Sequence, residues 1–167
     1  MPEGSELRAS KVRRQGPDLP LFQATFDGGV REVRDFLSET LAALAPLALL
    51  AEELAAAELV LAEALNNILE HAYRGLPGRK TIRLSCLHRS DGLHVTLVDR
   101  GRGMPAGQVP LGLSQPVDVA LSDLPEGGFG WFLVKTLTAG LAYSRRGNCN
   151  FLRLRVPLSD VSHAKRI

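Results

Sequence analysis

Apolar residues recur every three to four positions along two long stretches of the chain, at about 29–44 and 52–73. This spacing places apolar side chains on one face and is typical of amphipathic helices. Pro46 separates the two stretches, and glycine and proline residues at 75–78 follow the second. The pattern therefore predicts two consecutive helices. The apolar stripe of the second comprises Leu61, Leu65, Ile68, Leu69 and Ala72.

Alternation of apolar and polar residues is typical of strands, and it predicts five of them. They are expected at 21–26, 81–87, 93–99, 141–146 and 149–156. Ser90-Asp91-Gly92 and Gly147-Asn148 have the composition of hairpin turns. A third helix is expected at about 130–140, after a long loop at about 100–127 that is rich in glycine and proline. A loop of that length in a compact domain is usually functional.

The order of these elements predicts an α+β fold. We expect a two-layer α/β sandwich with a mixed, mostly antiparallel sheet of about five strands and three helices on one face. The folded domain is expected to span 20–158, between flexible tails at 1–19 and 159–167.

Charge and composition exclude several classes of protein. The formal net charge is +2, and no basic stripe alternates with aromatic residues, so direct binding of nucleic acid is not expected. The first twenty residues lack an apolar signal-peptide core, and acidic residues interrupt the Ala/Leu-rich stretch 41–65. We therefore expect a cytoplasmic protein that does not cross a membrane. Cys86 and Cys149 are expected to be small buried hydrophobic residues, because their spacing suits neither a metal site nor a disulfide framework.

Glu63 and Asn67 lie four residues apart on the second predicted helix, away from its apolar stripe. A carboxylate and an amide held side by side could bind a hydrated metal ion and accept a proton. They could also be two ordinary solvated residues. His71, one turn further along, could reach a phosphate or could be a structural residue at the helix end.

Two glycine-containing motifs are candidates for binding parts of a nucleotide. Asp99-Arg100-Gly101-Arg102-Gly103 follows a predicted strand, where a carboxylate can accept a hydrogen bond from an exocyclic amine such as that of adenine. Gly127-Gly128-Phe129-Gly130 precedes the third helix, whose free N–H groups would suit a polyphosphate. Taken alone, the first motif could be a strand-end turn and the second a flexible hinge. Neither is a P-loop or a dinucleotide fingerprint.

Taken in order, these motifs resemble the GHKL nucleotide-binding fold, the superfamily of gyrase, histidine kinases and MutL. The likeness to small bacterial anti-sigma-factor serine/threonine kinases is closer and covers about 20–157. It rests on three stretches, namely Glu-Ala-Leu-Asn-Asn-Ile-Leu-Glu-His-Ala-Tyr, Leu-Pro-Glu-Gly-Gly-Phe-Gly-Trp-Phe-Leu-Val-Lys and Tyr-Ser-Arg-Arg-Gly-Asn-Cys-Asn-Phe-Leu-Arg-Leu.

The resemblance implies a role for each motif. Asp99 would bind the adenine amine of ATP, Asn67 would ligate Mg²⁺, and Glu63 would be the general base. The segment 104–127 would form a lid over the ATP. The remaining residues would shape the adenine and phosphate pockets, namely His71, Gly101, Gly103, Gly127, Gly128, Phe129 and Gly130. The final hairpin departs from the family's Gly-Thr signature, because Gly147-Asn148-Cys149-Asn150 stands there. Asn150 is a candidate replacement donor.

The resemblance further implies a homodimeric anti-sigma factor that phosphorylates a STAS-type anti-anti-sigma protein and restrains a sigma factor or similar regulator. Two alternatives stay open from the sequence. One is a nucleotide-gated module that sequesters a partner without transferring phosphate. The other is an ATPase domain that acts in trans on a histidine of a partner.

Overall fold

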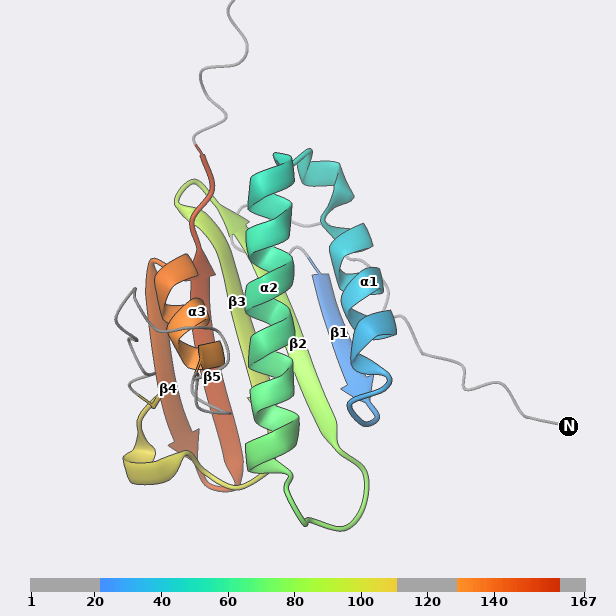
Figure 1. Cartoon of the computed structure of the whole chain (residues 1–167), viewed down its shortest axis with the longest axis vertical. Coiled ribbons are helices and arrows are strands. Elements are labelled where there is room, and N and C mark those ends of the chain that lie inside the picture. The colour runs from blue at the N-terminus through green and yellow to red at the C-terminus, as the bar shows by residue number, and fades with distance from the viewer. Residues whose placement is uncertain (1–21, 111–128, 160–167) are drawn as a thin grey trace, which may run out of the picture.

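The computed structural model describes residues 22–110 and 129–159. Its sheet has five strands in the order β1-β2-β3-β5-β4 (Figure 1). The strands are β1 (Phe22–Asp27), β2 (Thr81–Arg89), β3 (Gly92–Asp99), β4 (Gly140–Arg146) and β5 (Cys149–Val156). All four pairings are antiparallel. The sheet predicted as mostly antiparallel is thus antiparallel throughout the described residues.

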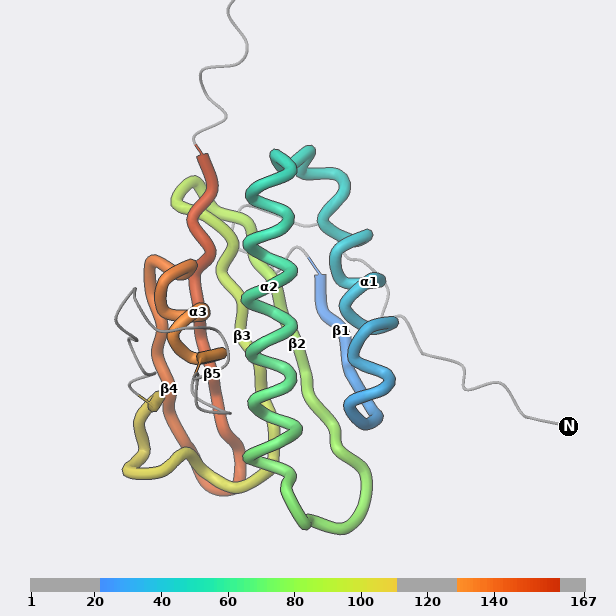
Figure 2. Tube along the Cα trace, in the orientation of Figure 1, coloured from blue at the N-terminus to red at the C-terminus, as the bar shows by residue number. Residues whose placement is uncertain are grey.

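The helices α1 (Val33–Ala43), α2 (Ala51–Asn67) and α3 (Phe129–Leu137) cover one face of the sheet, as the tube in Figure 2 also shows. The predicted α+β sandwich is confirmed. Short 3₁₀ turns occupy Ala45–Leu47 and Pro105–Gly107. No helix in the described ranges is both long enough and apolar enough to cross a membrane.

Two predicted helix ends were wrong by a few residues, whereas the end of the second helix, predicted at about 73, was right. The first helix begins at Val33 rather than 29, because Gly29 N donates to Glu32 Oε2 in a preceding turn. The third ends at Leu137, because Ala139 N donates to the Arg155 carbonyl and the chain joins the sheet. The second continues past Asn67 as a π-helical turn, Ile68–Ala72, in which Tyr73 N donates to the Ile68 carbonyl at 3.2 Å.

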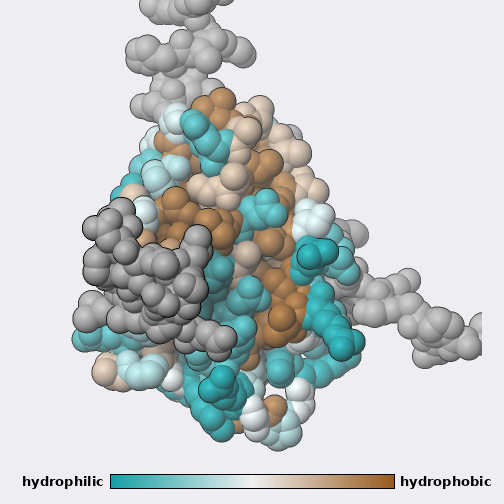
Figure 3. Space-filling model, viewed as in Figure 1, coloured by the Kyte–Doolittle hydropathy of each residue, from teal (hydrophilic) through white to brown (hydrophobic). Residues whose placement is uncertain are grey.

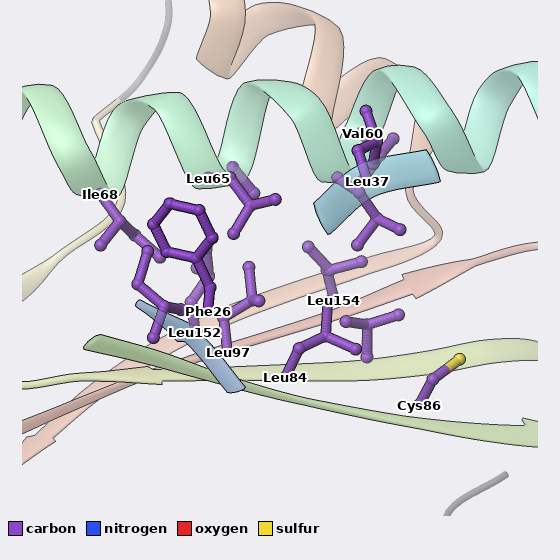
Figure 4. Packing of buried hydrophobic residues seen from close by; sticks show 14 of the residues in the cluster. Phe26, Leu37, Val60, Leu65, Ile68, Leu84, Cys86, Leu97, Leu152 and Leu154 are labelled. Atoms are coloured by element: carbon purple, nitrogen blue, oxygen red, sulfur yellow. The ribbon is translucent and has the colours of Figure 1, made fainter. Parts of the chain in front are cut away.

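The core lies between α2 and the sheet (Figure 4). Leu65 of α2 faces Leu84, Leu97 and Leu152, one from each of three neighbouring strands, and all four are at most 2% exposed. Burial of this apolar surface is the main force that holds the two layers together. Cys86 is buried here as predicted, whereas Cys149 is only half-buried, and both thiols are free.

The strand register places the polar ends of three strands beside one another. Asp99 at the end of β3 pairs with Asn150 near the start of β5, and Asn150 pairs with Arg145 near the end of β4. In Figure 1 these strand ends lie at the lower edge of the sheet, where α2 also ends. The predicted tail 1–19 lies outside the described residues. The predicted tail 159–167 does too, except for Ser159, whose N–H donates to Glu53 Oε1 at 2.6 Å.

Candidate functional site

A cavity of about 550 Å³ lies where α2 and its π turn meet the lower ends of β3, β4 and β5. Figure 3 shows the helix-bearing face, on which apolar residues cover much of the upper half and hydrophilic residues are more frequent toward the lower end. The cavity is lined by Asn67, Ile68, His71, Ala72, Arg74, Asp99, Arg102, Gly103, Met104, Pro105, Pro110, Trp131, Tyr143 and Asn150. Its volume suits a small organic molecule.

Asp99 is the buried acid of this cavity, with only 4% of its surface exposed. Its Oδ1 accepts hydrogen bonds from Gly101 N at 2.8 Å and from Asn150 Nδ2 at 2.7 Å. Burial raises the pKa of the Asp99 carboxyl, and the bonds from Asn150 and Gly101 oppose that rise. Within the described residues Oδ2 accepts no hydrogen bond. It is therefore available to an amine donor of a ligand.

Asn150 holds Asp99 in this orientation. Its Oδ1 accepts from Arg145 Nη1 at 2.6 Å and from the Tyr143 hydroxyl at 2.7 Å. Because a guanidinium can only donate, the amide must present Nδ2 to Asp99. The same Nδ2 also contacts the carbonyls of Arg102 at 3.0 Å and Gly101 at 3.3 Å. The amide hydrogens of Asn150 thus point at Asp99 and the loop after it.

The hairpin β4–β5 also fixes the start of the long loop. Arg145 Nη1 donates to the Gly101 carbonyl at 2.9 Å, and Met104 N donates to the Tyr143 hydroxyl at 3.0 Å. Sequence reasoning missed Tyr143 and Arg145. The Gly147-Asn148 turn does imply that Arg145 pairs with Asn150, but the pairing of β5 with β3 leaves no local signal in the sequence.

Close packing requires glycine at 101 and leaves little space for a side chain at Gly103. A Cβ on Gly101 would lie 2.6 Å from the Ala72 carbonyl oxygen, which accepts a hydrogen bond from Arg102 N at 2.8 Å. A Cβ on Gly103 would lie 3.1 Å from Arg145 Cδ and 3.3 Å from the Tyr143 hydroxyl. The loop after β3 therefore rests directly on the π turn, which a side chain at Gly101 would prevent.

Glu63 and Asn67 are half-buried residues of α2 that face the start of α3. A Cβ on Gly130 would overlap Glu63 Oε2 and would lie 3.5 Å from Asn67 Nδ2. The structure thus brings together three residues from two of the predicted motifs. Glu63 lies at the N-terminal end of α3, where the helix dipole is positive.

Asn67 Nδ2 is buried and has no hydrogen-bond partner among the described residues. Because an unsatisfied buried amide costs about 1–3 kcal/mol, a ligand atom is the expected partner. A half-turn of the amide exchanges nitrogen and oxygen, so the group can face a phosphate oxygen or a cation. The residue present therefore fits the Mg²⁺–phosphate role that the sequence predicts, although that role stays a prediction.

Of the other predicted site residues, some line the cavity, one packs elsewhere and others lie outside the described residues. His71 is exposed and lines the cavity. The cavity wall also includes Trp131, which is 5% exposed and was not among the predicted site residues. Phe129, at the start of α3, is 44% exposed and packs against Phe132 instead. Gly127 and Gly128 lie outside the described residues, as does most of the predicted lid 104–127. Its first residues, Met104 and Pro105, contribute to the cavity wall.

The chain is similar to known proteins over most of its length. A family model described as "Histidine kinase-like ATPase domain" matches residues 22–156. Among solved structures, the chain is similar to the blue-light activated histidine kinase of Erythrobacter litoralis EL346, with 27% identity over 68% of this chain and a TM-score of 0.47. It spans 33% of that protein. The histidine kinase domain of the same enzyme matches with 20% identity, a TM-score of 0.46, and coverage of 90% of this chain and 66% of that one. No curated protein sequence gives a significant match.

Proposed function

Because the chain belongs to the family of histidine kinase-like ATPase domains, we propose that it is an ATP-dependent serine/threonine-protein kinase. Its substrate would be a serine on a STAS-type anti-anti-sigma protein. In partner switching it would act as an anti-sigma factor that restrains a sigma factor or a similar regulator, as a cytoplasmic homodimer. The family supports the ATP-binding, kinase-type activity, and the narrower substrate and partners rest on the sequence motifs.

One observation carries the proposal of phosphoryl transfer. The Glu63 carboxylate, the Asn67 amide and Gly130 at the start of α3 lie together, and Asn67 lines the same cavity as the buried Asp99. A kinase must bind the base of ATP, hold its phosphates and position an acceptor hydroxyl. The cavity has Asp99 and Asn67 in its wall for the first two tasks, and Glu63 lies one helical turn before Asn67 on α2 for the third.

Each residue then has a defined task. Asp99 would accept a hydrogen bond from the adenine amine through its free Oδ2. Asn67 would hold Mg²⁺ and phosphate oxygens, and the metal would neutralise the phosphate charge. Glu63 would orient the serine hydroxyl of the substrate and take its proton. Trp131 and Met104 supply apolar surface to the cavity, which suits a planar base.

The test is a transfer assay with the full chain, γ-labelled ATP, Mg²⁺ and a purified STAS-domain protein. The wild type should give acid-stable phosphoserine. Glu63→Gln should lower the transfer rate about 100-fold or more, because general-base catalysis contributes that much, while nucleotide binding changes little. Glu58→Gln is the matched control, since Glu58 is an exposed residue of the same helix. Asp99→Ala should abolish both binding and transfer.

Two results would contradict the serine kinase, and a third would contradict only the role of Glu63. Nucleotide binding that needs Asp99 without any transfer would leave a nucleotide-gated binding module. Acid-labile phosphate on a partner would mean transfer to histidine. Equal transfer by wild type and Glu63→Gln would remove Glu63 from the mechanism. The homodimer is tested separately by sedimentation, and a monomer at micromolar concentration would contradict it.

A further inference from the structure

The face of the sheet opposite the helices is not covered by any element within residues 22–110 and 129–159. All three helices lie on the side that faces the viewer in Figure 1. Because successive side chains of a strand alternate between faces, residues next to the core residues point to this second face. Arg83 and Val98 pair across β2 and β3 on this face. It includes the half-buried Phe151 and the exposed Arg153 of β5.

Charge is distributed unequally between the two layers. The second face of the sheet carries Arg83, Arg153 and Arg155, and Arg79 and Arg100 lie at its end. Its acidic residues are already paired, Asp27 with Arg79 at 3.1 Å and Asp91 with Arg155 at 3.1 Å. Helix α2, by contrast, has four glutamates and neither lysine nor arginine. The small net charge of the chain therefore conceals a basic face.

Two adjoining hollows make a groove on this face. The larger, of about 520 Å³, lies under the loop 74–80 and combines apolar residues, Leu76, Pro77 and Val98, with the arginines 79, 83 and 100. The smaller, of about 200 Å³, shares Arg83 and Val98 with it and reaches Gln23 and Thr25 of the edge strand β1. Neither Arg83 nor Arg100 has an ion-pair partner in the described part of the chain.

We propose that this groove binds an extended acidic segment of a partner protein. Carboxylates of that segment would pair with Arg83 and Arg100, and an apolar side chain would occupy the hollow between Leu76 and Val98. Charge complementarity selects this partner, because the groove offers unpaired guanidinium groups around an apolar floor. None of the residues that line this groove lines the 550 Å³ cavity, so the inference goes beyond the proposed kinase function.

A protein segment fits this face better than a nucleic acid does. Single-stranded nucleic acids bind by stacking bases on aromatic rings along a basic track. Phe151 is the aromatic residue of β5 on this face, and Arg153 already lies over its ring at 5.5 Å. The Tyr73 hydroxyl in the larger hollow donates to the Thr81 carbonyl and accepts from Arg100 N. Tyr73 is itself only 5% exposed, so it offers no open ring face.

The test measures binding of a short fluorescein-labelled peptide, rich in glutamate and containing two leucines, by fluorescence anisotropy without nucleotide. The double variant Arg83→Glu/Arg100→Glu should raise the Kd about tenfold or more, because it replaces attraction with repulsion. Arg31→Glu/Arg34→Glu changes the net charge equally on the helix-bearing side, at exposed positions, and should change the Kd less than about twofold. Thermal unfolding of both variants verifies that they fold.

The competing outcomes are distinct. Failure of the wild type to bind the peptide, or equal weakening by the two double variants, would overturn a specific acidic-segment site. Equal affinity for a peptide in which glutamine replaces glutamate would overturn recognition of the carboxylates. Tighter binding of an oligothymidylate of the same charge would assign the face to nucleic acid. Because no ATP is present, these results are independent of whether the chain proves to be a kinase.

Discussion

Burial of the Asp99 carboxylate destabilises the folded state, but the same carboxylate can accept a hydrogen bond from a ligand. The carboxyl is almost fully buried, and burial raises its pKa above the usual value of 3.8. The folded chain therefore holds this proton at a pH at which the unfolded chain releases it. It follows that the contribution of Asp99 to stability falls as the pH rises from about 3.8 through the raised pKa.

Asp99→Asn should separate these two effects. The amide keeps an oxygen for Gly101 N and Asn150 Nδ2 but removes the buried charge, so Tm at neutral pH should match or exceed that of the wild type. The difference in Tm should shrink as the pH is lowered below the raised pKa, because the wild-type carboxyl is then protonated. Nucleotide affinity should fall about 100-fold, because a donor would then face the donor amine. Calorimetry at several pH values measures the Tm difference, and a binding titration measures the nucleotide affinity. A lower Tm with unchanged nucleotide binding would contradict the role of Asp99 as a buried acid that accepts the adenine amine.

Asn150→Asp should instead destabilise the chain with rising pH. The introduced carboxylate would lie beside Asp99 Oδ1, where the amide now donates at 2.7 Å, and the Arg102 carbonyl would lose the donor at 3.0 Å, while Gly101 keeps Arg145 Nη1. Two touching carboxylates retain a shared proton when folded and release it when unfolded. We expect a loss of about 2 kcal/mol at neutral pH that diminishes in acid. The exposed Asn148→Asp in the adjacent turn should change the stability little in denaturant titrations.

At the scale of elements, α2 and α3 approach each other through Glu63 and Gly130. Gly130→Ala places a methyl group where Glu63 Oε2 lies, so either the carboxylate or the helix must move. We expect a loss of at most about 1 kcal/mol, because the end of the flexible Glu63 side chain can move aside and alanine is the better helix former. In the Glu63→Ala background the same change should be neutral or stabilising. Denaturant titration of the four proteins gives the coupling energy. A zero coupling energy would mean that the two residues do not touch.

Elements with a clear period were predictable from the sequence. Alternation located all five strands, and the 3–4 spacing located α1 and α2, because both patterns follow from burying one face of an element. The π turn at Ile68–Ala72 was not predicted, since its side chains continue the helical pattern and only the backbone bond from Tyr73 N to the Ile68 carbonyl marks it. That turn brings the Ala72 carbonyl against Gly101 and Arg102.

At the scale of the molecule, the site joins residues that are remote in the sequence. Glu63, Asn67 and Asp99 were predicted from their motifs, because their spacing along one helix or at one strand end is a local property. The network of Tyr143, Arg145 and Asn150 around Asp99 arises from the pairing of β3 with β5, which are separated by the long loop and α3. Such pairing depends on the whole sheet, and no single stretch of sequence encodes it.

Cys86 offers a measure of the stability of this whole assembly. Its side chain is 2% exposed within the core, and burial raises the pKa of the thiol to about 12. Only the thiolate is nucleophilic, so Cys86 in the folded chain should resist alkylation near pH 8. Cys149 is half-buried in β5 and should react first, and Cys149→Ser removes it from the measurement. Labelling of Cys86 should then require unfolding of the chain.

Nucleotide should slow that labelling if it binds the folded chain alone. With Mg²⁺ and ATP at about 100 times Kd, the unfolded population falls by about 100-fold, and the alkylation rate should fall equally when refolding outpaces alkylation. The Asp99→Asn variant, whose affinity should be about 100-fold lower, is the control and should show only about twofold protection at the same ATP concentration. Mass spectrometry of iodoacetamide-treated Cys149→Ser protein gives the rate. Labelling as fast as that of a cysteine peptide, or equal protection of both proteins by ATP, would contradict a single cooperative domain that binds nucleotide through Asp99.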